Sequence, residues 1–450
     1  MKYAALPLTV ALVLAGQTAQ GSTFFDQSKI TLGLKNFYFN NDNRESQADL
    51  GNAAYAGQSK EWGQALLLNA VSGFTEGPVG FGLDAQVQVG LRLDGGGRSG
   101  KAGIDRTPGQ LFPLDSDGSA VDEFSRLGMT AKARLAGTEI RYGTLTPRQP
   151  FLVSNDGRLL PQTFHGTQIT SNDIQGLTLT GGLIEHATGR ASTDRTGLGV
   201  SGGSRESNKL WFGGADWKAS DSLTLQYYAS QLEDYYTQHF AGLTHQFRLD
   251  DNRALKLDLR YFHTDSQGAN ASASGRARGY RVGGYTRDNS GEIDNRTWSA
   301  AATFTHGAHA LLLGYQAVSD GSAFVQPNQG SLASSPGAAG TSLYLLTDRQ
   351  ITNFSRAGER TAFAEYSLDF SSLGVPGLKT SLAYLRGSDI RTAAGAEQQE
   401  WERDLRVDYT LQQGPLKGLA LSWRNASLRS EASADTDQHR FIVSYQIALR

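Results

Sequence analysis

The sequence predicts an all-β protein: a single transmembrane antiparallel β-barrel of about 18 strands. Three observations lead to this prediction. Apolar and polar residues alternate with period two in segment after segment, short turn-like links alternate with long polar ones, and the chain has no cysteine. Beyond the first residues it has no apolar run long enough for a spanning helix. Backbone pairing alone must then hold the fold.

The first 21 residues have the features of a cleaved secretory signal. Lys2 gives a positive start, residues 4–15 form an apolar stretch too short to span a bilayer, and residues 19–21 end in small side chains. We expect the mature chain to begin at Ser22 and residues 22–450 to form one barrel domain. The alternative is an N-terminal helix or strand that stays buried in the fold.

The period-two alternation is clearest in residues 79–93. Apolar side chains occupy the odd positions, and polar residues or glycine occupy the even ones. Alternate residues of a strand point to opposite faces, so one face is apolar and the other suits water. The same pattern recurs around residues 29–38, 129–135, 255–261, 402–411, 419–424 and 440–447.

The links between these segments also alternate. Short links are expected at 72–78, 136–138, 172–176, 218–221, 250–253, 306–308, 371–377 and 413–417, and longer polar stretches lie between them. The longer stretches are 41–60, 94–121, 148–163, 187–206, 233–237, 265–295, 319–359, 388–401 and 430–437. A meander with short periplasmic turns and long extracellular loops is typical of transmembrane barrels. Around 18 strands leave a lumen wide enough for water.

Charged residues on the polar face of the strands are candidates for the pore lining, where selectivity can be set. The basic candidates for contact with a solute are Lys132, Arg134, Arg141, Lys256, Arg260, Arg406 and Arg424. Several of them on neighbouring strands could guide an anionic group through the pore. The alternative is that they pair with acidic neighbours, as on any charged channel wall.

Residues 148–165 differ from the other long links. Apolar side chains, among them Phe151 and Leu160, flank a polar centre with an Asn-Asp-Gly turn signal. A solvated loop does not need this apolar content, whereas a loop that folds inward and packs on the wall does. We therefore expect a constriction loop whose polar tip, formed by Ser154, Asn155, Asp156 and Arg158, lies in the pore. The alternative is a loop that only caps the barrel mouth.

Composition and motifs argue against other functions. Lys and Arg total 42 and Asp and Glu total 44, with no polybasic run, so nucleic acid is not an expected partner. No G-x-S-x-G elbow and no metal-ligand spacing of histidines occurs, so we predict no enzyme activity, no cofactor and no metal. A hydrolase embedded in a barrel and a general non-selective porin remain the alternatives.

At this point the sequence resembles the OprD family of substrate-specific outer-membrane porins. The segments that carry the resemblance are VDEFSRLGMTAKARL (121–135), SNDGRLLPQTFHG (154–166), AGERTAFAEYSLDFSSLGVPGL (357–378), EWERDLRVDYTLQQGPLKGLALSWRNASLRS (400–430) and RFIVSYQIAL (440–449). The resemblance implies a monomeric 18-stranded barrel in the outer membrane, surrounded by lipids and lipopolysaccharide. It also implies inward loops, a ladder of basic residues on one wall, and passive diffusion of small solutes. These would be basic amino acids, small peptides or carboxylate-bearing organic acids.

Overall fold

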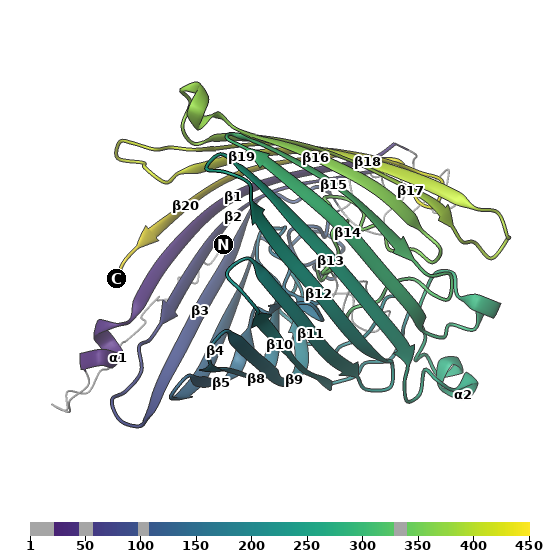
Figure 1. Ribbon diagram of the computed structural model, residues 1–450, viewed down its shortest axis with the longest axis horizontal. Coiled ribbons are helices and arrows are strands. Elements are labelled where there is room, and N and C mark those ends of the chain that lie inside the picture. The colour runs from purple at the N-terminus through teal and green to yellow at the C-terminus, as the bar shows by residue number, and fades with distance from the viewer. Residues whose placement is uncertain (1–21, 45–56, 98–107, 328–339) are drawn as a thin grey trace.

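The computed structural model describes residues 22–44, 57–97, 108–327 and 340–450. In these ranges eighteen strands form one antiparallel sheet, and its closure confirms the predicted barrel (Figure 1). The wall strands are β1 (Lys29–Asn43), β2 (Gln58–Val71), β3 (Val79–Asp94), β4 (Glu123–Leu135), β5 (Thr138–Leu145), β8 (Thr163–Ile174), β9 (Leu177–Thr188), β10 (Leu210–Lys218), β11 (Leu223–Leu232), β12 (Tyr236–Arg248), β13 (Arg253–Ser266), β14 (Asp294–His306), β15 (His309–Val318), β16 (Arg360–Asp369), β17 (Leu378–Ile390), β18 (Gln398–Thr410), β19 (Ala420–Ser430) and β20 (Thr436–Ala448).

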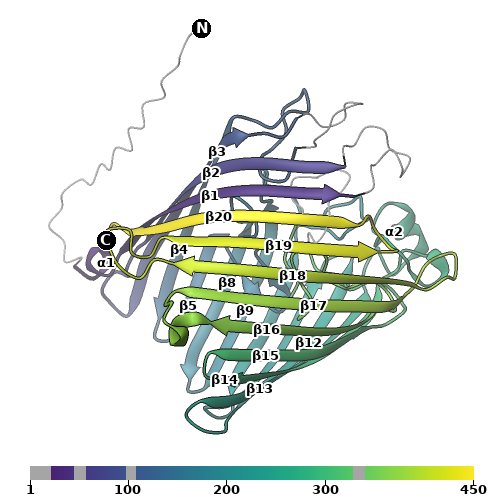
Figure 2. The ribbon, with the colours of Figure 1, turned by 90° about the horizontal axis from the view of Figure 1, so that it is seen from above.

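The barrel closes where the last strand meets the first. β20 lies between β1 and β19, as the view from above shows (Figure 2). At this seam Tyr38 on β1 is directly opposite Phe441 on β20 and Trp62 on β2. Because the sheet has no free end here, backbone groups that would otherwise face lipid are paired.

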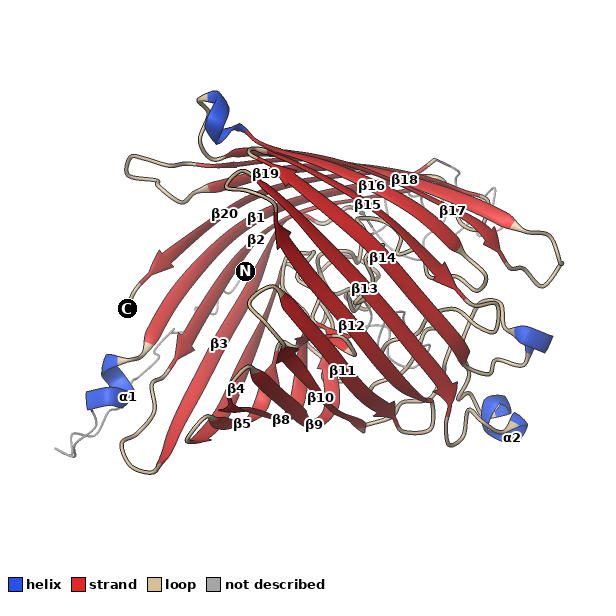
Figure 3. Ribbon diagram, in the orientation of Figure 1, coloured by secondary structure: helices blue, strands red, loops and turns tan. Residues whose placement is uncertain are grey.

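Helical structure is confined to the ends of the barrel (Figure 3). α1 (Ser22–Asp26) lies at the end with the C-terminus and the short turns, and α2 (Ala273–Ala277) lies at the opposite end. In the described ranges, two short 3-10 helices, Arg287–Asn289 and Phe370–Leu373, lie in connections between strands. No helix in the described part of the chain is long and apolar enough to cross a membrane.

The two faces of the sheet follow the predicted period. On β3 the odd-numbered residues Phe81 and Leu83 are 58% and 45% exposed, and they point outward. The even-numbered Gln88 points inward and is buried. An exposed apolar outer face combined with a buried polar inner one is the reverse of a soluble protein and suits a lipid environment.

Apolar clusters lie inside the barrel, beneath loops that fold into it. Two of these clusters contain residues of the connection between β5 and β8. In the first cluster this connection packs on strands β8–β13, and in the second it packs on β1 and β2. A third lies between β14–β17 and the connection between β15 and β16. The lumen is therefore partly filled by loops, and these loops define the site.

Candidate functional site

The connection between β5 and β8, residues 146–162, folds inward and is called the constriction loop below. It contains a small hairpin formed by β6 (Arg148–Gln149) and β7 (Leu152–Val153). Phe151 stacks on Phe212 of β10, with ring centroids 4.4 Å apart. Leu159 and Leu160 are fully buried in the cluster with Phe37 of β1. The apolar residues that predicted an inward loop thus pack on the wall at both of its ends.

The polar tip of the constriction loop is a tight turn. The Asn155 side chain accepts a hydrogen bond from the Gly157 N–H at 2.8 Å, and the Ser154 hydroxyl donates to the Gln162 carbonyl at 3.2 Å. Asp156 forms an ion pair with Arg148 at 3.2 Å, and both side chains are largely exposed. This ion pair is the part of the tip that faces the solvent in the lumen.

Two basic residues hold the tip against the seam of the barrel. The Lys35 ammonium on β1 donates to the carbonyl of Arg158 at 2.8 Å and to that of Asp156 at 3.4 Å. The Arg440 guanidinium on β20 donates to the carbonyls of Gly157 at 3.5 Å and Gln350 at 2.6 Å. Arg158 does not face Asp156: its guanidinium lies over the Phe39 ring, 4.5 Å from the centroid. Sequence reasoning did not select Lys35 or Arg440.

A second loop also folds into the lumen. Residues 340–359, between β15 and β16, are fixed by Glu402 of β18, whose carboxyl group accepts the N–H groups of Ile351 at 2.9 Å and Thr352 at 2.8 Å. Phe354 of the same segment is fully buried. The sequence analysis treated this stretch only as a long polar loop, so its inward position is a finding of the structure.

A carboxylate fixes a third loop in the same way. Glu61 of β2 is fully buried and accepts the N–H groups of Gly109, Gln110 and Leu111 at 3.2, 2.6 and 3.0 Å. Phe112 packs in the cluster next to the constriction loop. Three loops therefore narrow the pore together, and buried carboxylates hold two of them to the wall.

Three arginines lie side by side on the wall next to the constriction-loop tip. Arg406 on β18 pairs directly with Arg424 on β19, and Arg424 pairs directly with Arg440 on β20. Arg406 forms an ion pair with Asp408. Arg424 has no ion pair within 4.0 Å in the described chain and donates only a long hydrogen bond, 3.3 Å, to the Ser422 hydroxyl. We call Arg406, Arg424 and Arg440 the arginine row.

The arginine row lines a cavity of about 260 Å³ in the lumen. Residues 348–350 of the second inward loop form another wall of this cavity, and Glu365, Ser381 and Asp404 complete it. Arg349 forms an ion pair with Glu365 at 2.6 Å. Since Arg440 is bound to loop carbonyls and only 6% exposed, Arg406 and Arg424 are the members of the row that a solute can reach.

Asp348 gives this cavity a group that titrates near neutral pH. Burial raises the pKa of the Asp348 carboxyl to about 7. The hydrogen bond from the Leu343 N–H, 3.0 Å long, and the nearby Arg190 and Arg349 oppose this effect without cancelling it. Burial also lowers the pKa of Arg190, to about 10, so this guanidinium stays charged at neutral pH.

Three of the predicted basic residues lie together on the short-turn side of the constriction loop, and Arg141 lines a cavity with Arg148 and Gln149 of that loop. Lys132 is opposite Arg141 across β4 and β5. Lys132 is buried, forms an ion pair with Asp84 at 2.6 Å, and donates to the Ser72 carbonyl at 2.8 Å. Arg134 lies over the ring of Phe74, 4.3 Å from its centroid. The remaining member, Arg141, forms an ion pair with Glu139.

The two predicted residues on β13 differ from each other. Lys256 is exposed on the inner face and has no ion pair in the described ranges. Arg260 forms an ion pair with Asp258 at 2.9 Å, donates to the Tyr344 carbonyl at 3.1 Å, and lies 4.3 Å from the centroid of the Tyr344 ring. Arg260 therefore supports the second inward loop. Of the seven predicted basic residues, the structure places Arg406 and Arg424 at the constriction.

Comparisons with known proteins agree with this architecture. The model of a family described as outer membrane porin, OprD family, matches residues 22–449. Porin D of Pseudomonas aeruginosa is 29% identical, and the match covers 100% of this chain and 99% of Porin D.

Solved structures are also similar. Pseudomonas aeruginosa OccK8 (OprE) superposes with a TM-score of 0.84 at 44% identity, over 95% of this chain and 100% of that one. Pseudomonas aeruginosa OpdK, in a structure with vanillate, superposes with a TM-score of 0.79 at 32% identity, over 94% of this chain and 100% of that one.

Proposed function

This chain belongs to the OprD family of outer-membrane porins, and we propose that its constriction selects small solutes that carry a carboxylate. It is a substrate-specific channel of the outer membrane and not an enzyme. What needs explanation is how this pore distinguishes one solute from another. A channel wall does so through the charges it presents at its narrowest point.

Arg424 is the single observation that carries the proposal. It lies in the centre of the arginine row, at the constriction, without a carboxylate partner in the described chain. A guanidinium presents a rigid fork of N–H donors that matches the two oxygens of a carboxylate. Arg406, directly opposite across the strands and half-exposed, adds a second donor group within reach of the same solute.

The acidic side of the constriction favours organic acids over basic amino acids. Asp156 is the exposed acid of the constriction-loop tip, and Arg148 already pairs with it at 3.2 Å. A cationic side chain of a solute would have to compete with Arg148, whereas a carboxylate finds Arg424 unpaired. Vanillate, which was present in the OpdK structure, is an aromatic carboxylate and thus an example of this class.

The other predicted residues have supporting roles in this proposal. Lys132, Arg134 and Arg141 lie on the path toward the periplasmic end, where Asp84 and Glu139 pair with Lys132 and Arg141 and the Phe74 ring packs on Arg134. Lys256 contributes a positive charge to the wall along β13, and Arg260, which pairs with Asp258, supports the second inward loop. Ser154, Asn155, Asp156 and Arg158 shape the tip that faces the arginine row.

The proposal includes the state of the mature protein. Residues 1–21 are removed as a signal peptide, and residues 22–450 form one barrel. The barrel works as a monomer, in contact with the lipids and lipopolysaccharide of the outer membrane around its whole circumference.

Planar-bilayer recording of charge variants tests the proposal. Arg424→Gln should lower the anion-to-cation permeability ratio, obtained from the reversal potential in a salt gradient, and Arg424→Glu should invert the preference. Both should also weaken the block of ionic current by vanillate or benzoate, by about tenfold for Arg424→Gln, because one charge-assisted hydrogen-bonding group is lost.

The matched control is Arg386→Gln on β17. Arg386 lies on the same face of β17 as the exposed, outward-pointing residues Leu382 and Tyr384, and it is itself exposed. The variant therefore also removes one positive charge, but from the outer wall. This variant should leave both readouts unchanged. If Arg424→Gln also leaves them unchanged, carboxylate selection does not occur at the arginine row.

A further inference from the structure

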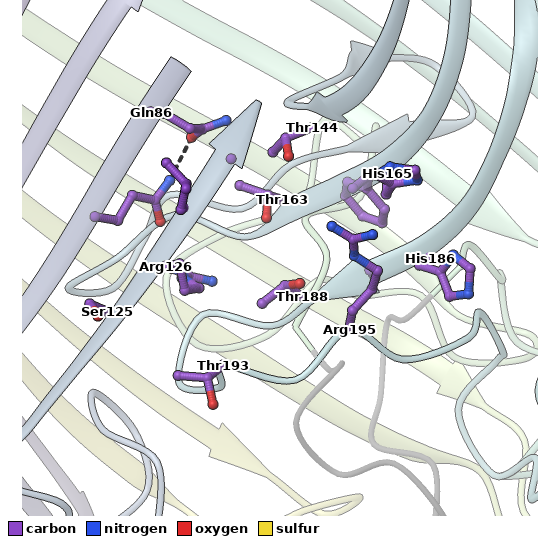
Figure 4. A pocket seen from close by; sticks show the side chains of 15 residues that line it. Gln86, Ser125, Arg126, Thr144, Thr163, His165, His186, Thr188, Thr193 and Arg195 are labelled. Carbon is purple, nitrogen blue, oxygen red and sulfur yellow. Dashed lines mark hydrogen bonds between the residues drawn. The ribbon is translucent and has the colours of Figure 1, made fainter. Parts of the chain in front are cut away.

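The barrel wall has a gap beside the constriction loop. β4 pairs with β5 only from Thr130 to Leu135, because the chain leaves the wall after Leu145 to form the constriction loop. The upper part of β4, residues 123–129, pairs with β3 on one side and with no described strand on the other. A cavity of about 210 Å³ occupies the gap, between β4, β8, β9 and the loop that follows β9 (Figure 4). We call this cavity the wall slot.

The wall slot passes through the barrel wall. On its inner side it shares Gln86, Gly128 and Thr144 with a cavity of about 300 Å³ below the constriction loop. On its outer side it is lined by Leu127, which is 67% exposed, and by His165. The slot is thus lined by residues from both faces of the sheet.

The outer mouth of the slot lies at the upper edge of the lipid-facing band. Below it on the same strands, toward the short turns, are the exposed apolar residues Met129, Tyr142 and Ile169. His165 contacts Tyr142 edge-to-face, with ring centroids 5.3 Å apart. Aromatic side chains with polar neighbours mark the level of the lipid headgroups in barrels of this kind. The long loops are extracellular, so this is the outer leaflet.

Basic groups gather around the outer mouth. His165 and His186 are directly opposite each other on β8 and β9, and Arg195 approaches them from the loop after β9 (Figure 4). Arg195 is exposed and has no ion pair in the described chain. The acid among them is Glu185, whose carboxylate is 3.8 Å from His165 Nδ1.

Several buried nitrogens of the slot have no hydrogen-bond partner. They are Nδ1 of His165, Nδ1 of His186 and Nε of Arg126. Arg126 uses its other nitrogens to donate to the carbonyls of Gly189 at 2.8 Å and Pro161 at 3.0 Å, and so ties both flanking loops to β4. Buried polar nitrogens without a partner are costly, so a ligand that forms hydrogen bonds with them would be stabilised here.

We propose that the outer mouth of the wall slot binds a phosphate group of a lipopolysaccharide molecule in the outer leaflet. The phosphate oxygens accept from Arg195 and the two histidines, while the acyl chains lie on the exposed apolar side chains below. The headgroup also covers the open edge of β4, where unpaired backbone groups would otherwise face lipid. This deepens the lipid contact proposed above and does not depend on the selectivity of the pore.

Binding of defined lipid A molecules to the refolded mature chain tests the proposal. Native mass spectrometry in detergent gives the affinity for bis-phosphorylated lipid A and for its dephosphorylated form. The phosphorylated form should bind more tightly, and Arg195→Gln should reduce this preference about tenfold, as expected for loss of a charge-assisted contact. The double variant His165→Gln/His186→Gln should reduce it by a smaller factor, because hydrogen-bonding groups are lost without loss of the Arg195 charge. Arg195→Lys keeps the charge and should keep most of the affinity.

Three results would overturn the proposal. One is equal affinity for the two lipids. Another is an equal loss on Arg386→Gln, the matched arginine on the outer face of β17, because the contact would then not be specific to the slot. The third is complete displacement of lipid A by inorganic phosphate, at the same phosphate concentration for both lipid forms. This result would indicate a site for free anions and not for a lipid. Heat-modifiable mobility on gels verifies that each variant has a closed barrel. The Arg195 and histidine variants should also keep the reversal potential of the unmodified chain, which distinguishes this test from the selectivity test of Arg424.

Discussion

Side chains of the same type on the same face take different roles here according to what covers them. Arg424 and Arg440 are neighbours across two strands, and both point into the lumen. Loop carbonyls cover Arg440, which therefore fixes loops, while Arg424 keeps its donors for a solute. Parity along a strand predicts the face of a residue. It does not predict what a loop from a distant part of the sequence will place above it.

The residues that sequence reasoning missed illustrate this limit. Lys35 has the parity of a lumen residue, but its partners are carbonyls more than a hundred residues away in the constriction loop. Lys132 and Arg134 were predicted pore-lining residues, yet near the short turns Asp84 pairs with Lys132 and the Phe74 ring packs on Arg134. No local pattern in the sequence separates a compensated charge from an uncompensated one.

Asp348 should make ion selectivity depend on pH near neutrality. Its pKa is raised to about 7, so the carboxyl loses its charge as the pH falls from about 8 to about 6. Loss of a negative charge beside Arg349 makes the cavity more positive, and the anion-to-cation permeability ratio should rise as the pH falls. Reversal potentials measured over this range check the expectation, and Asp348→Asn should remove most of the change. If the Asp348→Asn variant shows the same pH dependence as the unmodified chain, another group causes that dependence.

The same shift has a consequence for stability, with a defined sign. The folded-state pKa of Asp348 lies above the ordinary value of 3.8, so the folded state holds a proton that the unfolded state has lost. The contribution to stability is therefore full below the ordinary pKa and decreases as the pH rises through about 7.

At the scale of elements, the strands could be predicted and the positions of two loops could not. Alternation with period two is a local property, and the described strands begin and end close to the expected links. Parts of three long links, 45–56, 98–107 and 328–339, lie outside the described residues. The inward course of residues 146–162 was also predictable, because its apolar residues required a surface to pack on. The 340–359 loop gave no such signal: it is held by Glu402, a single acid of a distant strand.

Glu402→Gln should loosen this second inward loop. A glutamine side chain accepts one of the two N–H groups and presents its own N–H donors to the other, so the loop loses one of the two backbone hydrogen bonds at a cost of about 1–3 kcal/mol. We expect a larger open-channel current with more noise in single-channel records. The matched control is Glu431→Gln, an exposed acid in the loop between β19 and β20. Equal records for the two variants would show that Glu402 does not limit the pore.

At the scale of the whole molecule, the outer surface supports a single barrel surrounded by lipid. Exposed large apolar side chains occur on strands all around the wall, including Phe81 on β3, Trp211 on β10, Leu313 on β15 and Phe441 on β20. They occur around the circumference of the described wall, so lipid can surround a single barrel on all sides.

We therefore expect the refolded protein to be monomeric. Light scattering coupled to size exclusion in detergent should give the protein mass of one chain, slightly below the 48.4 kDa of the full sequence once the signal is removed. Bilayer recordings should show independent single steps. Steps that always occur in threes, together with a threefold mass, would contradict a monomer.

The arginine row has a further consequence for the folded barrel. Like charges directly opposite each other on neighbouring strands destabilise a sheet by a few tenths of a kcal/mol to about 1 kcal/mol per pair. The row holds two such pairs, Arg406 with Arg424 and Arg424 with Arg440. Selection for stability alone would remove them, so this wall is a place where activity and stability oppose each other. A neutral residue at position 424 would make the barrel more stable and less selective for anions. An anion that passes through the pore reduces the repulsion between the arginines while it is bound there.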